Sequence, residues 1–374
     1  MELTSEQEMI RDTVREFVAA EVEPSVDEAD RAQEFPEEVW DGLADLDLTG
    51  LTVPEEYGGF EVDKVTYSIV NEELAYGHLA VATALGVQHL ATACISEFGS
   101  DAQKEEWLPG MADGRPVGAF VLTEPHAGSD PAAMTTEARK EGEEYVINGK
   151  KQWITNGERA DVGLLFAKTD REDPDTVTQF IVPMDTDGVS VGKKEDKLGL
   201  RASDTTTLIF EDARIPAENR LTPVGRGLKA AFSVLTTGRL AIASQAVGLA
   251  QAALDDAVDY ANEREQFGKP IIEHQAIGHT LADMQTNVQA SRLLARDAAR
   301  RNESEVDAKA ASMAKYFASE TAVEVASDAV QVLGGYGYTK DFDVERYYRD
   351  AKITTIYEGT SQIQQKIIAR HLKE

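Results

Sequence analysis

The sequence predicts a mainly helical protein with a β domain in the middle of the chain. Only 7% of its residues are aromatic, 12 are prolines, and many stretches are rich in alanine, a composition that favours helix. Apolar residues recur at helical spacing towards both ends, whereas short β-branched and aromatic runs occupy the middle. With 374 residues, of which 42% are hydrophobic, the chain is long enough for two or three domains around a large core.

The pattern changes near Gly118 and again after Val224, which divides the chain into three parts. We expect an N-terminal helical domain over residues 1–115, an antiparallel β domain over 116–225 and a C-terminal helical bundle over 226–374. No repeat with a period of 20–50 residues and no low-complexity segment interrupts this order. The expected architecture is therefore helical domain, β domain, helical bundle.

The N-terminal domain shows clear helix signals. Thr4 and Gln7 form a Thr-x-x-Gln capping box, which predicts the start of the first helix. A further helix is expected from Asp63 to about Phe98, and Asp101 is a candidate N-cap for one more.

The middle domain is predicted from turn and strand signals. Asn148-Gly149 stands between two β-rich runs, 145–147 and 152–155, and predicts a hairpin turn. Further strands are expected at 164–166, 179–182 and 205–210. The C-terminal bundle is expected to contain helices over 228–262, 272–301, 305–333 and 342–349 and one after Gly359, with a glycine cluster at 334–337.

The charge balance excludes several function classes. The formal charge is −30, from 67 acidic and 37 basic side chains. Such a surface repels nucleic-acid phosphates and anionic lipids, so we expect no nucleic-acid or membrane binding driven by bulk charge. Because the acidic residues are dispersed, two explanations stay open: an ordinary acidic surface, and adaptation to concentrated salt, which screens the repulsion. We favour the second, a halophilic origin.

Cysteine usage and hydropathy point to a cytoplasmic protein. The single cysteine, Cys94, excludes an intrachain disulfide and a cysteine-based zinc cluster, and its neighbours indicate a buried structural thiol. The N-terminus shows no basic segment followed by an apolar one, so no export signal is expected. The most apolar stretch, residues 78–95, is interrupted by polar residues, which is typical of a buried helix rather than a membrane span.

Three segments together resemble signature segments of the acyl-CoA dehydrogenase family. They are Leu-Thr-Glu-Pro-His-Ala-Gly-Ser-Asp at 122–130, Gln-Val-Leu-Gly-Gly-Tyr-Gly-Tyr at 331–338 and Ile-Tyr-Glu-Gly-Thr-Ser-Gln-Ile-Gln at 356–364. The stretch 264–270 and the pair His274-Gln275 match as well, so that the resemblance covers essentially the whole chain. One departure is His126, where the family commonly has a small residue. The resemblance implies the family's fold, an FAD between the β domain and the C-terminal bundle, assembly as a homotetramer, and no metal.

The resemblance also assigns the residues that bind FAD. Hydroxyl and backbone N–H groups of the 122–130 loop would meet the flavin, and the Trp153 indole would lie beside the isoalloxazine. A neighbouring subunit would extend Arg264 and other residues to the diphosphate and adenosine, since a guanidinium fork suits phosphate. Without the resemblance, the 122–130 loop would be interpreted as a turn and Trp153 as a core residue. Arg264 would be interpreted as part of a surface ion pair, and Gly334-Gly335 as a helix C-cap. The predicted set is Phe120, Leu122, Thr123, Gly128, Ser129, Trp153, Thr155, Arg264, Phe267, Gln275, Gln331, Gly335, Thr360 and Gln362.

Glu358 is the predicted catalytic base. The resemblance implies that it removes the α proton of a saturated acyl-CoA while a hydride passes from the β carbon to flavin N5, which produces the trans-2-enoyl-CoA. Its backbone N–H and a ribityl hydroxyl would polarise the thioester oxygen. Burial would make the carboxylate a stronger base, whereas the alternative is a helix-start carboxylate favoured by the macrodipole. The predicted substrate residues are Ser129, Arg239, Tyr357 and Gly359.

Two alternatives to an acyl-CoA dehydrogenase that delivers electrons to an electron-transfer flavoprotein stay open. An acyl-CoA oxidase of the same fold would use O2, but oxidases usually carry long C-terminal additions that this chain does not show. A non-catalytic or nucleic-acid-associated relative of the same fold is disfavoured by the acidic charge and by an intact Glu358. Residues 82–95 contain no arginine or lysine, so we expect a neutral short- or medium-chain acyl group, straight or branched.

Overall fold

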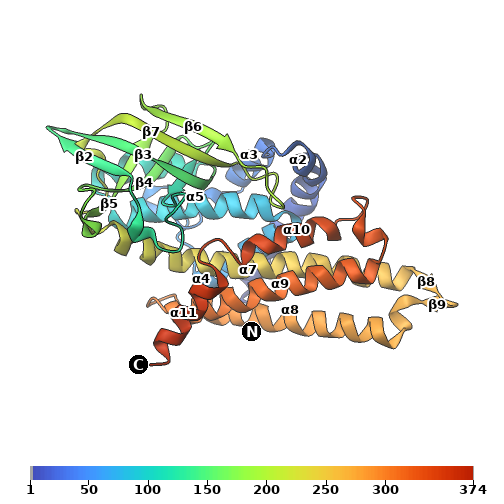
Figure 1. Cartoon of the computed structure of the whole chain (residues 1–374). Helices are drawn as coiled ribbons and strands as arrows, with labels where there is room; N and C mark the ends of the chain where they lie inside the picture. Colours follow the sequence, from blue (N-terminus) through green and yellow to red (C-terminus); the bar gives the residue numbers. More distant parts are fainter. Residues whose placement is uncertain (1–2, 374) are drawn as a thin grey trace.

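The computed structural model describes residues 3–373 and shows helices, then a β domain, then helices (Figure 1). The ends of the first and third expected domains, at residues 1, 2 and 374, lie outside the described residues. The α-helices before the sheet are α1 (Ser5–Phe17), α2 (Val26–Ala32), α3 (Glu37–Asp45), α4 (Lys64–Gly77), α5 (Leu79–Phe98) and α6 (Asp101–Ala112).

The N-terminal helices begin and end for local reasons. The Thr4 hydroxyl accepts from the Gln7 N–H and the Gln7 side chain accepts from the Thr4 N–H, both at 3.2 Å, so the predicted capping box is confirmed. The single helix expected over 63–98 is wrong: extended backbone at His78 (φ −155°) separates α4 from α5. The N-cap of α6 is Ser100 rather than Asp101, because the Ser100 hydroxyl accepts from the N–H of Gln103, the third residue of that helix, at 3.3 Å.

Helix α5 is the core helix of the protein. Its length and composition would suit a membrane span, yet 83% of its most apolar window is buried inside the protein. Cys94 on this helix is fully buried, as expected. One side of α5 packs against α7 (Gly227–Glu263), and the other contacts the sheet through β1 (Gly118–Val121). The helix therefore joins the helical bundle to the β domain.

The β domain is a seven-stranded sheet with the order β1-β4-β2-β3-β7-β6, and β5 also pairs with β4. Its strands are β1, β2 (Glu137–Glu141), β3 (Glu144–Thr155), β4 (Val162–Lys168), β5 (Val177–Pro183), β6 (Val189–Lys194) and β7 (Thr205–Pro216). Most pairs are antiparallel, but β4 runs parallel to both β1 and β2, so the sheet is mixed rather than wholly antiparallel. The three strands expected at 164–166, 179–182 and 205–210 are present as β4, β5 and β7.

The hairpin predicted at Asn148-Gly149 is wrong. Both residues lie inside the continuous strand β3, where the register against β7 shifts between Ile147 and Gly149. The hairpin turn lies earlier, at residues 141–144, where Gly142 takes a left-handed φ of 62°. A Cβ at Gly149 would collide with the Thr136 side chain, so this glycine serves a close packing contact within the strand.

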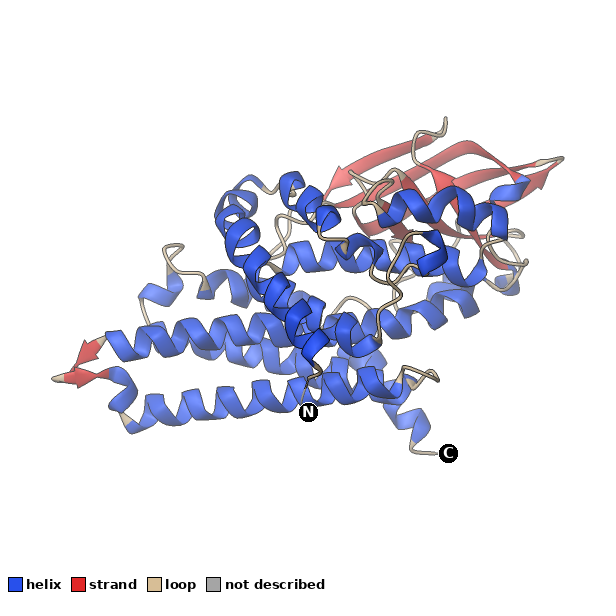
Figure 2. Cartoon of the chain, turned by 180° about the vertical axis from the view of Figure 1, so that it is seen from behind, coloured by secondary structure: helices blue, strands red, loops and turns tan. Residues whose placement is uncertain are grey.

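The C-terminal bundle contains the three longest helices of the described residues: α7, α8 (Gln275–Arg301) and α9 (Ala308–Leu333). They are followed by α10 (Val344–Thr354) and α11 (Ser361–His371), as expected. A short ribbon of β8 (Glu265–Gln266) and β9 (Lys269–Pro270) joins α7 to α8 at the end of the bundle remote from the sheet (Figures 1 and 2). Helix α7 packs against α4, α5, α8, α9 and α10 and so organises the bundle.

Candidate active site

The predicted base lies in the loop between α10 and α11, on unusual backbone. Glu358 has a φ of 53° and Gly359 a φ of 94°, so two successive residues are left-handed. Such a conformation is strained for glutamate and persists only where surrounding contacts hold it. Helix α11 begins later, because Thr360 is its N-cap and its hydroxyl accepts from the Ile363 N–H. Glu358 is therefore not a residue of the helix start.

Two side chains hold the carbonyl groups of this loop. The Gln364 side chain of α11 donates to the carbonyls of Glu358 (3.1 Å) and Gly359 (2.9 Å). The Lys315 ammonium of α9 donates to the carbonyl of Gly359 at 2.8 Å. The backbone N–H groups of Glu358 and Gly359 have no hydrogen-bond partner within residues 3–373. The loop thus presents fixed, free donors beside the carboxylate.

The carboxylate of Glu358 is enclosed. Its Oε2 atom is buried and has no hydrogen-bond partner among the described residues. The opposite wall is Gly238 of α7: a Cβ at that position would lie 2.8 Å from Oε2 and 3.3 Å from the Leu90 side chain of α5. Glycine is required there because any side chain would displace the carboxylate. A buried, unpaired polar atom is costly in a merely structural role and points to function.

Burial and nearby charges set the pKa of the Glu358 carboxyl group near neutral pH. Burial raises the pKa of Glu358 to about 7, against the opposing attraction of the Arg239 and Lys315 charges. Arg239 on α7 is itself buried, its Nε has no partner in the described chain, and burial lowers its pKa. A carboxyl group with a pKa near neutrality is well matched to proton abstraction at physiological pH.

Tyrosine and threonine side chains lie beside the base. The Tyr357 hydroxyl lies 3.4 Å from the hydroxyl of Thr83 on α5, and burial raises the pKa of Tyr357. Tyr67 of α4 is buried against the His89 ring, and the charge of Glu358 contributes to raising its pKa. These side chains are uncharged, so the wall near Glu358 suits an apolar acyl chain.

The predicted flavin-loop residues lie at the edge of the β domain. Phe120 lies within β1 and packs on the Leu90 cluster of α5, while Leu122, Thr123, Gly128 and Ser129 follow β1. The N–H groups of Gly128 and Ser129 have no partner in the described part of the chain. A Cβ at Gly128 would meet little, only Thr123 at 4.0 Å, so the loop surface is open there.

Trp153 and Thr155 lie at the end of β3, beside this loop. Trp153 has a left-handed φ of 63°, where the β3–β7 register shifts, and its residue surface remains 54% exposed. A bulky residue in this conformation is an outlier that a functional site explains. Trp153 is thus not the core tryptophan that its sequence would otherwise suggest.

A buried ion pair supports the loop after β1. Glu124 and Lys151 lie 3.0 Å apart with side chains 1% and 0% exposed. Glu124 also accepts from the N–H groups of Thr135 (2.7 Å) and Thr136 (2.9 Å). The Lys151 charge and these hydrogen bonds outweigh burial and lower the pKa of Glu124 to about 2. His126, the departure noted in the sequence, is half exposed and lies 3.7 Å from Glu124.

Three other buried glutamates, Glu72, Glu73 and Glu124, are less suited to act as the base because each is ion-paired. Glu124 is paired with Lys151, Glu72 with Arg292 and Arg296 at 2.7 Å each, and Glu73 with Arg15 at 2.7 Å. Each of these carboxylates is held by cations, in contrast to the unpartnered Oε2 of Glu358. Within residues 3–373, no group of histidine, cysteine and acidic side chains could hold a metal ion.

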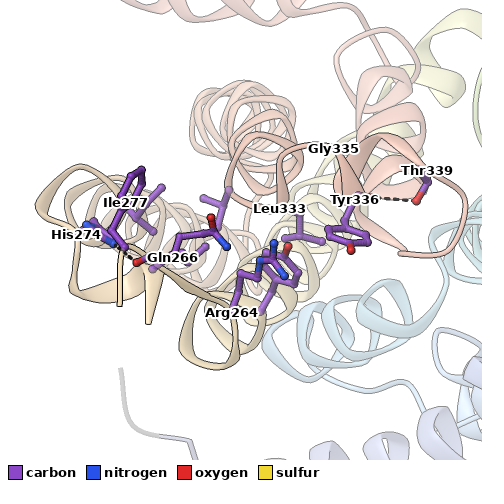
Figure 3. A pocket seen from close by; sticks show the side chains of 12 residues that line it. Arg264, Gln266, His274, Ile277, Leu333, Gly335, Tyr336 and Thr339 are labelled. Carbon is purple, nitrogen blue, oxygen red and sulfur yellow. Dashed lines mark hydrogen bonds between the residues drawn. The ribbon is translucent and has the colours of Figure 1, made fainter. Parts of the chain in front are cut away.

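The remaining predicted FAD residues lie far from the base. Arg264, Phe267 and Gly335 line a cavity of about 670 Å³ at the end of the bundle, where the Arg264 guanidinium lies 5.7 Å from the Tyr336 ring (Figure 3). Gln275 begins α8 and Gln331 lies near the end of α9, at this same end. Along α7, Arg264 lies about 39 Å from Gly238 at 1.5 Å per residue.

The residues present fit FAD in two separate halves. At the β domain, an exposed indole, free backbone N–H groups and the Thr155 hydroxyl suit an isoalloxazine ring. At the far end of the bundle, a guanidinium, aromatic rings and Phe267, which is 94% exposed, suit a diphosphate and an adenine. Thr360 and Gln362 lie at the start of α11, with Gln362 exposed. The two sets therefore lie in different parts of the fold, one at the β domain and one at the end of the bundle remote from the sheet.

Family models match almost the whole chain. "Acyl-CoA dehydrogenase, N-terminal domain" matches residues 4–115, "Acyl-CoA dehydrogenase, middle domain" residues 119–213, and "Acyl-CoA dehydrogenase, C-terminal domain" residues 225–373. The chain belongs to the acyl-CoA dehydrogenase family. It is an enzyme of that family, with the family's fold of N-terminal helical, middle β and C-terminal helical regions.

Curated relatives match over the full length. The short-chain specific acyl-CoA dehydrogenase of Rattus norvegicus is 44% identical over 100% of this chain and 91% of its own. An acyl-CoA dehydrogenase of Bacillus subtilis is 45% identical over 100% of this chain and 99% of its own. Subunit CarC of the caffeyl-CoA reductase-Etf complex of Acetobacterium woodii is 41% identical over 99% and 98% of the two chains.

Solved structures of acyl-CoA dehydrogenases are similar to this chain over its full length. Butyryl-CoA dehydrogenase from Megasphaera elsdenii is similar with a TM-score of 0.97 and 40% identity, and each chain is covered completely. An acyl-CoA dehydrogenase of Bacillus anthracis, complexed with FAD, is similar with a TM-score of 0.95 and 34% identity over 100% of this chain and 67% of its own.

Sequence reasoning missed four residues that build the site. Lys315, Gln364 and Gly238 surround Glu358, and Lys151 supports the flavin loop. A signal existed for Lys315: it stands among alanines and serines three and four positions away, on the helix face that becomes buried. The other three became visible only through contacts between distant segments.

Proposed function

We propose that this enzyme oxidises a saturated short-chain acyl-CoA to the trans-2-enoyl-CoA, with FAD as cofactor and Glu358 as the α-proton base. One observation carries the proposal: the Oε2 atom of the Glu358 carboxylate is buried and unpartnered, and the residue is held on left-handed backbone opposite Gly238. Burial keeps its pKa near neutrality, as proton abstraction from carbon requires. The carboxylates of Glu72, Glu73 and Glu124 are also buried, but each is ion-paired, unlike that of Glu358.

Glu358, the backbone of the 358–359 loop and Arg239 have separate roles in the reaction. The Glu358 carboxylate accepts the α proton, and the free N–H groups of the 358–359 backbone can donate to the thioester oxygen as negative charge develops on it. FAD, when bound, accepts the hydride from the β carbon. Arg239 stabilises the ionised form of Glu358 before the transfer.

Two observations support a short acyl chain. The relatives include a short-chain specific enzyme and a butyryl-CoA dehydrogenase. Near Glu358, the bulky side chains of Tyr357 and Tyr67 and the Thr83 hydroxyl form one uncharged side of the site, while the cations Arg239 and Lys315 act on the carboxylate from α7 and α9. A dicarboxylic acyl group would find no cation on α5 to pair with its second carboxylate.

The electron acceptor is an electron-transfer flavoprotein, and the enzyme is a homotetramer in which subunits share FAD. The CarC relative, part of a reductase-Etf complex, supports the acceptor. Arg264 lies about 39 Å along α7 from Gly238, which faces the base, and this supports a second subunit that supplies Arg264 and its neighbours to the flavin held by the first.

The first prediction tests the reaction itself. The purified protein should be yellow, and its visible flavin band should bleach without oxygen when butyryl-CoA is added. A panel of acyl-CoA thioesters should show fastest bleaching with short chains, and slow bleaching with glutaryl-CoA. Slow reoxidation by air supports the dehydrogenase, whereas rapid reoxidation assigns the chain to the oxidases. A colourless protein that FAD does not reconstitute would contradict the proposal.

The second prediction concerns salt. With a formal charge of −30, subunits repel more strongly as ionic strength falls, because screening weakens. Since the FAD site needs two subunits, dilution of salt should dissociate the oligomer and release FAD together. Light scattering and flavin absorbance across one salt series measure both. An oligomer and an FAD occupancy indifferent to salt would favour an ordinary acidic surface.

A further inference from the structure

Lys315 is a buried lysine whose position no structural ion pair explains. Its side chain is 0% exposed, and α9 surrounds it with small buried residues such as Ala311, Ala318 and Ser319. Fully buried lysines are rare unless a carboxylate pairs with them. Lys151, the other fully buried lysine among the described residues, has such a partner in Glu124, whereas Lys315 forms no ion pair in residues 3–373.

The ammonium of Lys315 is instead directed at the catalytic loop. It donates to the Gly359 carbonyl at 2.8 Å, directly after the base. Burial lowers the pKa of Lys315 to about 8, and the charge of Glu358 is the largest opposing influence. In return, the Lys315 charge lowers the pKa of Glu358. The fold thus keeps a costly cation next to a strained loop rather than at the surface.

The other groups around the base come from every neighbouring element. Arg239 on α7 is the second cation that acts on Glu358, and Tyr67 on α4 and Tyr357 on the loop itself are the neutral titratable groups. Glu320 on α9 acts on Lys315 and accepts from the Ser361 hydroxyl. Arg239 makes no hydrogen bond to the loop backbone in the described chain, so Lys315 alone combines a charge with a backbone anchor there.

We propose that Lys315 is a positioning residue for the base: it anchors the left-handed 358–359 backbone through the Gly359 carbonyl, and its charge favours the ionised form of Glu358. The inference rests on the proposed function of Glu358. The Gln364 side chain holds the same carbonyl from α11, so the backbone is clamped from two helices. Removal of Lys315 would loosen one side of the clamp and leave Arg239 as the remaining cation near the carboxylate.

The test compares Lys315→Met, which removes charge and donor but keeps length, with Lys315→Gln, which keeps a donor without the charge. Exposed Lys352 on α10 supplies the matched control, Lys352→Met. Infrared difference spectra of the oxidised enzyme across pH measure the ionisation of the Glu358 carboxyl, and Glu358→Gln identifies its band. Single-turnover bleaching by butyryl-CoA measures the rate at matched FAD occupancy.

Because Lys315 lowers the pKa of Glu358, its loss should raise the pH midpoint of the Glu358 band by roughly one unit in both variants. Lys315→Met should also slow bleaching at the high-pH plateau roughly tenfold to hundredfold through misplacement of the base, and Lys315→Gln should slow it less. Lys352→Met should match the wild type in both readouts.

An unshifted midpoint together with a wild-type plateau in Lys315→Met would overturn the inference. If that variant does not fold, Lys315→Gln decides by the same midpoint, and failure of both to fold would assign Lys315 to bundle stability and overturn the inference too. Failure of the proposed function looks different: the wild type would not bleach with any acyl-CoA, or Glu358→Gln would bleach as fast as the wild type.

Discussion

Glu358→Gln should keep the fold and FAD but lose most of the flavin reduction by butyryl-CoA. Glutamine preserves the size of the side chain and one oxygen, so the wall at Gly238 and the loop anchors remain satisfied. It cannot accept the α proton, and a positioned base contributes roughly 10²–10⁴-fold to rate. The loss is expected at every pH, because no ionisation of glutamine restores the base. Single-turnover bleaching at matched FAD occupancy is the measurement.

The matched control is Glu324→Gln, which neutralises an exposed glutamate on α9 and should leave the rate unchanged. Reduction of Glu358→Gln within about threefold of the wild-type rate would remove Glu358 from the mechanism, since a lost transition-state contact must appear in the rate. Ion pairs occupy Glu72, Glu73 and Glu124, so none of these three carboxylates stands ready to replace it.

Lys151→Met should destabilise the β domain strongly. The Lys151–Glu124 pair is almost fully buried, and removal of one partner leaves an uncompensated charge, which costs roughly 3–5 kcal/mol. The Lys151 ammonium also donates to the Leu122 carbonyl at 2.8 Å, so the predicted flavin loop should loosen and FAD occupancy should fall. Calorimetry and flavin absorbance measure the two effects.

The loss of stability in Lys151→Met should depend on pH through the ionisation of Glu124. The pKa of Glu124 is lowered on folding, so its contribution to stability is present above its unfolded value and is lost as pH falls towards 2. In Lys151→Met the penalty should therefore be largest at neutral pH and shrink on acidification, as Glu124 becomes protonated. The double variant Glu124→Gln/Lys151→Met should recover part of the loss. A single variant as stable as the wild type, or a double variant no better than the single, would contradict the prediction.

Local signals in the sequence predicted the elements well where side chains act on nearby backbone. The capping box at Thr4 and the helices α7, α8 and α9 follow from hydrogen bonds and spacing within a few residues. The Asn148-Gly149 hairpin failed because the requirement for glycine came from Thr136, a tertiary neighbour, rather than from a turn. A dipeptide signal cannot distinguish these two causes.

By itself, the sequence determined the family, the order of helical and β regions, and Glu358 as the candidate base, because these depend on local spacing and on motifs of consecutive residues. Only the tertiary structure decided that the Oε2 atom of Glu358 is unpartnered, that Gly238 and Lys315 lie beside the base, and that Arg264 lines a cavity at the far end of the bundle. The physical reason is that desolvation and charge depend on which distant segments pack together. Helix α7 brings Gly238 to the base and helix α9 brings Lys315 to the loop of the base.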